Sequence, residues 1–150
     1  MLCMAHSIIW PGLGAGADRV ELPIILYNVP SRTGIGIQPE TYVKLAQHPN
    51  IAAIKEANSD ISKIVETFAL VGDQLDIYSG NDDQIVPILS MGGQGCISVL
   101  SNVVPKETVA ITDQFFAGNV AEAARLQCQF MPLIRSLFCE SNPIPVKAAM

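Results

Sequence analysis

The sequence has 150 residues, of which 49% are hydrophobic and 15% charged, with a formal net charge of −5. A chain of this length can bury a substantial core. Its charged fraction lies well below the roughly 25% of ordinary globular domains, so we expect much of the chain to be buried in itself or against a partner. The acidic balance, without any run of lysines or arginines, argues against nucleic acid or an anionic membrane as the main partner.

Metal-ligating residues are few and scattered. The four cysteines and two histidines are Cys3, Cys96, Cys128, Cys139, His6 and His48. Zinc sites need ligands clustered at short spacing, so we predict no metal centre. The cysteines are interpreted as small core hydrophobes in a reducing compartment, the cytoplasm.

Residues 1–21 are predicted to form an irregular leader. A secretory signal peptide begins with a positively charged region, but the first basic residue here is Arg19. A signal peptide is therefore not expected, although Ala15, Gly16 and Ala17 resemble a small-residue cleavage site. No segment approaches the roughly 20 apolar residues that a membrane-spanning helix needs.

From Leu22 onwards, apolar runs alternate with amphipathic segments. The run at 23–29 has the pattern of a fully buried strand, and Pro30 and a pair of glycines end it. A helix is expected over residues 38–47, with a proline in its first turn. A second apolar strand follows at 51–56.

The alternation continues towards the C-terminus. Ser59 or Asp60 can cap the next helix, whose apolar positions are Ile61, Ile64, Val65, Phe68 and Ala69. Two further strands are expected at 75–79 and 95–99, separated by a helix over 84–91. The segments 106–116, 121–138 and 143–150 are then expected to be helical.

Buried strands that alternate with helices indicate βα units and a parallel sheet. Four such units fit a small doubly wound sheet or half of a (β/α)8 barrel, because a complete barrel needs about 250 residues. No glycine-rich dinucleotide motif follows a strand, so the dinucleotide-binding version of the doubly wound sheet is disfavoured.

Lys55 is the first candidate catalytic residue. It ends the apolar run 51–56, and in βα folds catalytic residues gather at the carboxyl ends of strands. Burial there would lower the pKa of the lysine, and a neutral amine can attack a ketone to form a Schiff base. The alternative is a structural lysine paired with Glu56 or Asp60.

Two more candidates follow the preceding strand. The hydroxyl group of Tyr27 could move protons during Schiff-base formation, although a tyrosine with a buried ring is an alternative. Arg32, in the expected loop 30–34, could bind a substrate carboxylate through two hydrogen bonds, or it could be a solvated surface residue.

Several stretches together resemble one enzyme family. Residues 27–34, Tyr-Asn-Val-Pro-Ser-Arg-Thr-Gly, resemble the Y-N-x-P-x-R-T-G motif of the 4-hydroxy-tetrahydrodipicolinate synthases, also called dihydrodipicolinate synthases. Residues 54–57, Ile-Lys-Glu-Ala, resemble the strand of that family that carries the Schiff-base lysine. The stretches 78–82, 92–99 and 142–147 resemble later segments in the right order.

This resemblance implies a fold and an activity. The fold is α/β: the C-terminal half of a TIM (β/α)8 barrel over residues 22–104, followed by a helical region at 105–150. The activity is a class I aldolase-type lyase reaction, in which lysine-bound pyruvate condenses with L-aspartate 4-semialdehyde on the route to lysine. The Schiff base needs no metal or organic cofactor.

The resemblance also assigns roles to residues. Lys55 would form the Schiff base, Tyr27 would relay protons, and Arg32 would hold the carboxylate of the semialdehyde. Gly80 and Ile97 would line the pyruvate pocket. Asn142 is a further candidate for substrate binding. Arg32 favours this branch over the related N-acetylneuraminate lyases and keto-sugar-acid aldolases, which remain an alternative.

The resemblance leaves the first four βα units of the family without a counterpart in this sequence, including a Gly-Thr-Thr-Gly-Glu segment that binds the pyruvate carboxylate. Half a barrel would expose two sheet edges and an apolar inner face. We therefore expect a homo-oligomer or a complementary half as partner. The alternative function is that of an inactive fragment or an interaction module.

Overall fold

The computed structural model describes residues 12–150. Two compact units divide between Tyr78 and Ser79, within the third strand. In the first unit, residues 12–17 are helical. Its further elements, in chain order, are β1 (Ile24–Asn28), α2 (Pro30–Thr33), α3 (Pro39–Leu45), β2 (Ile51–Glu56), α4 (Ile61–Val71) and most of β3 (Asp76–Ser79).

The strands follow the order β1-β2-β3-β4 in the sheet, which is also their order along the chain. β1 and β2 are parallel, and their register places Tyr27 opposite Lys55 and Asn28 opposite Glu56. Parallel strands joined by helices confirm the α/β fold class. Because side chains alternate along a strand, each of these two cross-strand pairs lies on its own face of the sheet.

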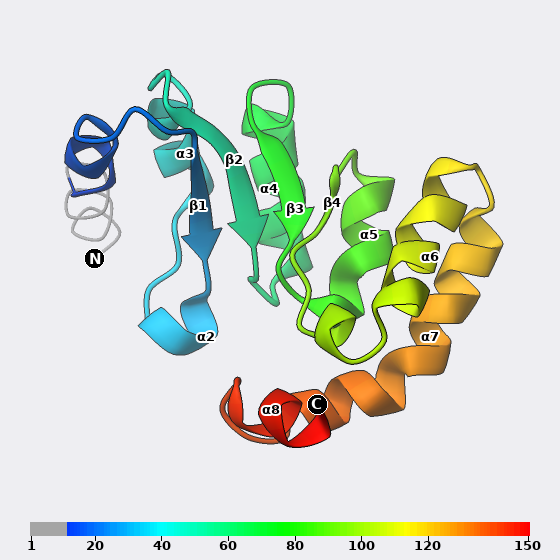
Figure 1. Ribbon diagram of the computed structural model, residues 1–150. Coiled ribbons are helices and arrows are strands. Elements are labelled where there is room, and N and C mark those ends of the chain that lie inside the picture. The colour runs from blue at the N-terminus through cyan, green and yellow to red at the C-terminus, as the bar shows by residue number, and fades with distance from the viewer. Residues whose placement is uncertain (1–11) are drawn as a thin grey trace. The chain divides into compact units, whose positions relative to one another are not determined.

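The two faces of β1 differ in exposure. Leu26 is buried, whereas Ile25 and Tyr27 are 50% and 49% exposed. Figure 1 shows α3 and α4 on one side of β1 and β2, which accounts for the buried side chains. The prediction of a fully buried strand at 23–29 was therefore wrong, since helices of this unit cover only one face.

Helix α4 begins as the sequence predicted. The side chain of Asp60 accepts hydrogen bonds from the backbone N–H groups of Ser62 and Lys63, which satisfies donors that a helix start leaves without partners. The predicted apolar face was too wide, however. Ile61 and Val65 are 44% and 50% exposed, and the buried residues of the helix are Ile64, Thr67 and Val71.

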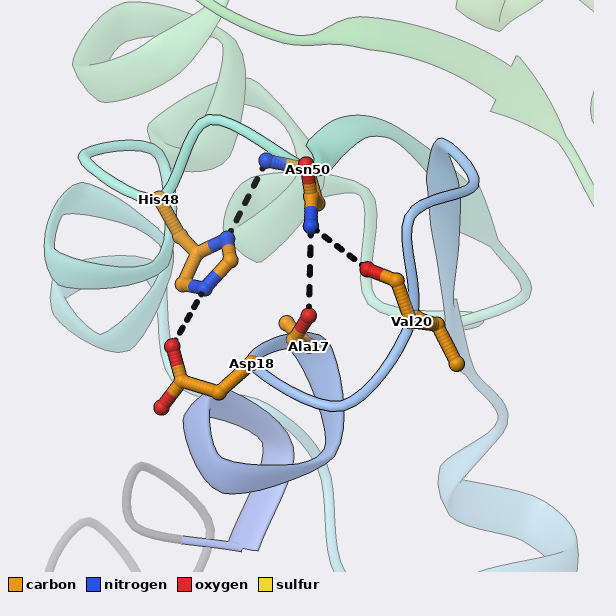
Figure 2. A network of polar contacts seen from close by, with 5 residues as sticks. All are labelled: Ala17, Asp18, Val20, His48 and Asn50. Carbon is orange, nitrogen blue, oxygen red and sulfur yellow. Dashed lines mark hydrogen bonds and ion pairs between the residues drawn. The ribbon is translucent and has the colours of Figure 1, made fainter.

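Asn50 fastens residues 17–20 to the loop before β2 (Figure 2). Its side-chain amide donates to the carbonyl oxygens of Ala17 and Val20 at 3.2 and 2.7 Å. His48 Nε2 lies 3.0 Å from Asp18 Oδ1, and His48 Nδ1 accepts from the backbone N–H of Asn50. The expectation of an irregular leader is thus corrected for residues 12–17, while residues 1–11 lie outside the described part.

The second unit is mostly helical. Its elements are η1 (Asp82–Gln84), α5 (Ile85–Ser90), β4 (Gly95–Cys96), η2 (Leu100–Asn102), α6 (Pro105–Phe116), α7 (Val120–Leu137) and α8 (Ile144–Ala149). Figure 1 shows α6 and α7 side by side, and residues of the two helices lie in contact. The strand expected at 95–99 is shorter, because the chain turns into η2 soon after Cys96.

Apolar clusters and one polar side chain hold the second unit together. One cluster is centred on Leu100, Ile134, Leu137 and Val146, and the other on Ile85, Leu89 and Ile111. Gln127 of α7 is buried; it donates to the carbonyl oxygen of Asp83 and accepts from the N–H of Val86. Within the described residues, no helix is both long and apolar enough to cross a membrane.

Candidate active site

Tyr27 and Lys55 lie side by side at the carboxyl ends of β1 and β2. The Lys55 ammonium nitrogen is 4.2 Å from the centre of the Tyr27 ring. An aromatic face at this distance attracts the charged form of lysine. The tyrosine is half exposed and the lysine is partly buried, so a small molecule can reach the phenol. The two residues that the sequence singled out therefore share one face of the sheet.

A buried polar network lies on the opposite face of the same two strands. The Glu56 carboxylate accepts from Asn28 Nδ2 at 2.9 and 3.2 Å, from the backbone N–H of Asn58 at 2.8 Å and from the Tyr42 hydroxyl at 3.4 Å. Glu56 is 1% exposed and Tyr42 is fully buried. Glu56 thus faces away from Lys55 along the strand.

Burial governs the ionisation of this network. It raises the pKa of the Glu56 carboxyl above its ordinary value, although the hydrogen bonds from Asn28 and Asn58 act in the opposite direction. Burial and the neighbouring Glu56 raise the pKa of Tyr42 as well. Tyr42 therefore keeps its proton and acts as a donor to the carboxylate across the working pH range.

Arg32 lies in the short helix α2, where the sequence predicted a loop. Pro30 opens this turn and Gly34 ends it with a left-handed φ of 71°, a conformation that glycine adopts without strain. The Thr33 hydroxyl donates to the carbonyl oxygens of Val29 and Ile35. Arg32 is exposed and lies on a firmly hydrogen-bonded turn at the end of β1.

The other three candidates lie in the second unit. Gly80 directly follows Ser79, whose carbonyl oxygen accepts from the N–H of Ile97 at 2.8 Å, so Gly80 and Ile97 are brought together. Ile97 is 37% exposed. Asn142 is partly buried and lies between α7 and α8, two residues before the start of α8.

Asp82 organises the loop after Ile97. It is 2% exposed, and its Oδ2 accepts from the backbone N–H groups of Val99 and Leu100 at 3.1 and 2.8 Å. Burial raises the pKa of this carboxyl. Asp82 is the first residue of η1, and its side chain binds the N-terminus of η2, 17 residues further along the chain.

The cysteines only partly match the expected core role. Burial raises the pKa of the Cys96 thiol to about 11, which suits a small hydrophobic side chain. Cys128 and Cys139 are exposed, because α7 and the turn after it present them to solvent, so the expectation was wrong for these two. Cys3 lies outside the described residues. Across residues 12–150, no three His, Cys, Asp or Glu side chains are grouped to hold a metal ion.

Comparison with known proteins decides the family. The model of the dihydrodipicolinate synthetase family matches residues 16–150. The chain belongs to this family. The match begins six residues before Leu22, where the resemblance was expected to start, so part of the predicted leader is family sequence.

Relatives of known sequence and structure agree with this assignment. The 4-hydroxy-tetrahydrodipicolinate synthase of Clostridium perfringens (strain SM101 / Type A) is 54% identical over 133 residues, 89% of this chain and 46% of the relative. The dihydrodipicolinate synthase structure of Thermotoga maritima covers 95% of this chain and 50% of its own, with 39% identity and a TM-score of 0.92.

A third relative adds a ligand. The chloride-inhibited dihydrodipicolinate synthase of Acinetobacter baumannii, solved in complex with pyruvate, matches with 37% identity and a TM-score of 0.90, and covers 95% of this chain and 49% of its own. The present chain thus spans about half the length of its relatives, and it corresponds to their C-terminal half. The predicted half-barrel fold is confirmed at this level.

Asn28, Glu56 and Tyr42 were not predicted as members of the site. Asn28 and Glu56 are polar residues at the ends of two apolar runs, and each directly follows a candidate, Tyr27 or Lys55. That pattern is a usable signal. Their pairing depends on the strand register, which the sequence of this dihydrodipicolinate synthetase family member does not reveal by itself.

Proposed function

We propose that this chain carries the Schiff-base half of a 4-hydroxy-tetrahydrodipicolinate synthase, with Lys55 as the nucleophile towards pyruvate. The observation that supports this most is the pairing of Lys55 with Tyr27 in register, with 4.2 Å between the ammonium nitrogen and the ring centre. Imine formation needs a neutral amine and a group that moves protons, and a phenol near the amine can supply the second.

The proposed reaction proceeds by balanced steps. Neutral Lys55 Nζ forms a bond to the keto carbon of pyruvate, and the former carbonyl oxygen takes up a proton to give a carbinolamine. Loss of water then gives the protonated imine, and loss of a methyl proton gives an enamine. The enamine carbon bonds to the aldehyde carbon of L-aspartate 4-semialdehyde, and water finally releases the lysine. The Tyr27 hydroxyl is proposed to carry protons in the first steps.

Substrate binding is assigned to the remaining candidates. Arg32 offers a guanidinium that can hold the semialdehyde carboxylate through two hydrogen bonds. Gly80 and Ile97 are proposed to line the pyruvate pocket, and Asn142 is proposed to bind substrate. No metal or organic cofactor enters the scheme, because the lysine itself provides the electron sink. The metabolic setting is lysine biosynthesis in the cytoplasm.

The complete condensation is proposed only together with the other half of the family fold. Relatives are about twice as long as this chain, and the unpaired edge of β1 in the described residues is suited to another strand. The proposed partner is therefore either a second copy of this chain in a homo-oligomer or a complementary half. An inactive fragment is the competing possibility.

The first experiment is reductive trapping. The chain is incubated with pyruvate and borohydride, which reduces the imine to a stable secondary amine, and peptide masses locate the adduct. We expect an adduct on Lys55 that Lys55→Arg abolishes and that Lys44→Arg, a change at an exposed lysine on α3, leaves intact. An unmodified Lys55 in the folded chain would contradict the proposal.

The second experiment tests complementation. A chain with the first four βα units of a relative is mixed with this one, and condensation of pyruvate with the semialdehyde is followed by product formation. Activity that depends on Lys55 supports the enzyme. If trapping succeeds but no mixture condenses the aldehyde, the chain is limited to the first chemical step.

A further inference from the structure

We propose that Asn28 is the positioning residue of this site and that its side chain fixes Tyr27, Lys55 and the turn carrying Arg32 in one arrangement. The inference rests on the function proposed above. It assigns to Asn28 and Glu56 a role in the reaction, although neither lies on the face of the sheet that carries Lys55.

Asn28 uses its whole side chain to join three segments. Its Nδ2 donates to both oxygens of Glu56, at 2.9 and 3.2 Å, which links β1 to β2. Its Oδ1 accepts from the N–H of Ile37 at 3.0 Å, which links β1 to the segment before α3. Asn28 is 2% exposed, so water does not compete for these bonds, and buried bonds of this kind specify one geometry.

The Asn28–Glu56 bond fixes Tyr27 and Lys55 through the strands themselves. Tyr27 precedes Asn28 and Lys55 precedes Glu56, so both pairs are adjacent in register on opposite faces. A slip of one residue would turn Lys55 towards the covered face, since side chains alternate. The cross-strand bond opposes such a slip at the end of the strands where the ammonium group lies 4.2 Å from the Tyr27 ring.

Glu56 is itself held in one orientation. Besides Asn28, the N–H of Asn58 and the hydroxyl of Tyr42 donate to its carboxylate. Three different donors thus surround the Glu56 carboxylate. Replacing any of these donors by a group that only accepts would leave two acceptors facing each other. Tyr42 comes from α3, so the helix layer also contributes to the position of β2.

The Asn28–Ile37 bond closes the turn that carries Arg32. Arg32 lies in α2, between the two bonded residues along the chain. Within the turn, the N–H of Gly34 donates to the carbonyl oxygen of Pro30, and the Thr33 hydroxyl donates to Val29. The start and end of this segment therefore depend on the same carboxamide that holds Glu56.

A reciprocal exchange of the two side chains tests the proposal. Asn28→Asp places a second carboxylate beside that of Glu56, so the hydrogen bond between them is lost. Glu56→Gln replaces one accepting oxygen by an NH2 group, which then faces other donors. In the double variant Asn28→Asp/Glu56→Gln, the introduced carboxylate can accept from the introduced amide and from the N–H of Ile37. Shape and total charge are then those of the native pair, with donor and acceptor exchanged.

Two readouts on the full chain follow the position of Lys55. One is the rate of adduct formation with pyruvate under borohydride. The other is the pH profile of Lys55 acetylation, measured by peptide mass and independent of pyruvate. We expect each single variant to slow adduct formation about ten- to hundredfold, as small misplacements of a nucleophile do, and to shift the acetylation profile. The double variant is expected to restore most of both.

Thr67→Val is the matched control. Thr67 is also 2% exposed, and its hydroxyl donates to the carbonyl oxygen of Lys63, so the change removes a hydrogen bond that lies within α4. It should lower stability without moving either readout. If a single variant does not fold, Asn28→Ser replaces it, because serine is too short to reach Glu56, and the same loss is expected.

Two results would overturn the proposal. One is a set of single variants whose adduct rate and acetylation profile match those of Thr67→Val. The other is a folded double variant that is as slow as the single ones. If the native chain forms no adduct, the proposed function fails, while the acetylation profiles still decide whether Asn28 positions Lys55.

Discussion

The two faces of the β1–β2 pair differ in exposure and in proposed role, although their residues alternate along the same strands. One face carries Tyr27 and Lys55, which remain partly accessible. The other carries Asn28 and Glu56, which are buried and saturated with hydrogen bonds. Reactive groups must be accessible to substrate, whereas the hydrogen bonds that position them are stronger where water is excluded. Because successive side chains of a strand point to opposite faces, neighbouring residues can meet these two requirements separately.

The largest expected effect is a difference in unfolding free energy between substitutions on the two faces. Ile54→Ala removes a fully buried side chain from the covered face and should cost about 2–5 kcal/mol of unfolding free energy, since it leaves a cavity. Ile25→Ala removes the same atoms from a side chain that is 50% exposed and should cost clearly less. Denaturant unfolding of both variants measures the difference, and equal losses would contradict the comparison.

Tyr27→Phe, on the accessible face, should change the reactivity of Lys55 and not the stability of the chain. Loss of the hydroxyl group removes the proposed proton carrier and is expected to slow Lys55 adduct formation about a hundredfold. The ring remains beside the ammonium group, so the unfolding free energy should hardly change. A trapping time course gives the rate, and a variant as fast as the native chain would exclude Tyr27 from the proton transfers.

Glu56, on the covered face, should make the stability of the folded chain depend on pH. Burial raises its pKa in the folded chain above the ordinary value of 4.5, so the folded state binds more protons than the unfolded state above that pH. Stability from this group is therefore complete below pH 4.5 and declines as the pH rises through the raised value.

Glu56→Gln removes this titration and isolates its effect. The native chain should lose stability relative to the variant as the pH rises above 4.5, and groups common to both cancel in the difference. Unfolding curves measured from acid to neutral pH provide the test. A constant difference across that range would mean that Glu56 titrates normally.

The smallest effect concerns the helix behind the covered face. Asp60→Ala removes the acceptor for the N–H groups of Ser62 and Lys63 and should cost about 1 kcal/mol. Asp60→Asn keeps an acceptor and should cost less. Neither change should alter Lys55 acetylation, because both keep the backbone N–H of residue 60, which donates to Asn58 beside Glu56. A shifted profile would show that the helix start also positions the lysine.

Local patterns in the sequence predicted much of this arrangement. The alternation of apolar runs and capped helices indicated the βα units, and the position of Lys55 and Tyr27 at successive strand ends predicted that they lie together. The helix α2 was missed, although Pro30 and Gly34 are typical residues for the start and end of such a turn.

Other features depend on contacts between distant residues. Asn28 and Glu56 are 28 residues apart, and only the strand register brings their side chains together. Asp82 bonds across 17 residues to the start of η2. The exposure of Ile25 and Tyr27 depends on which faces of a sheet receive helices. Apolar periodicity alone contains none of this information.

The closed turn between Asn28 and Ile37 has a consequence for how such a chain can diverge. The bonds that shape the turn include those of Asn28, Thr33 and the backbone. These bonds start from other side chains and from the backbone, so a substitution of the side chain at residue 32 removes none of them. Under the proposed role of Arg32, a lineage or an engineer could change the aldehyde specificity at this position while these bonds stay in place.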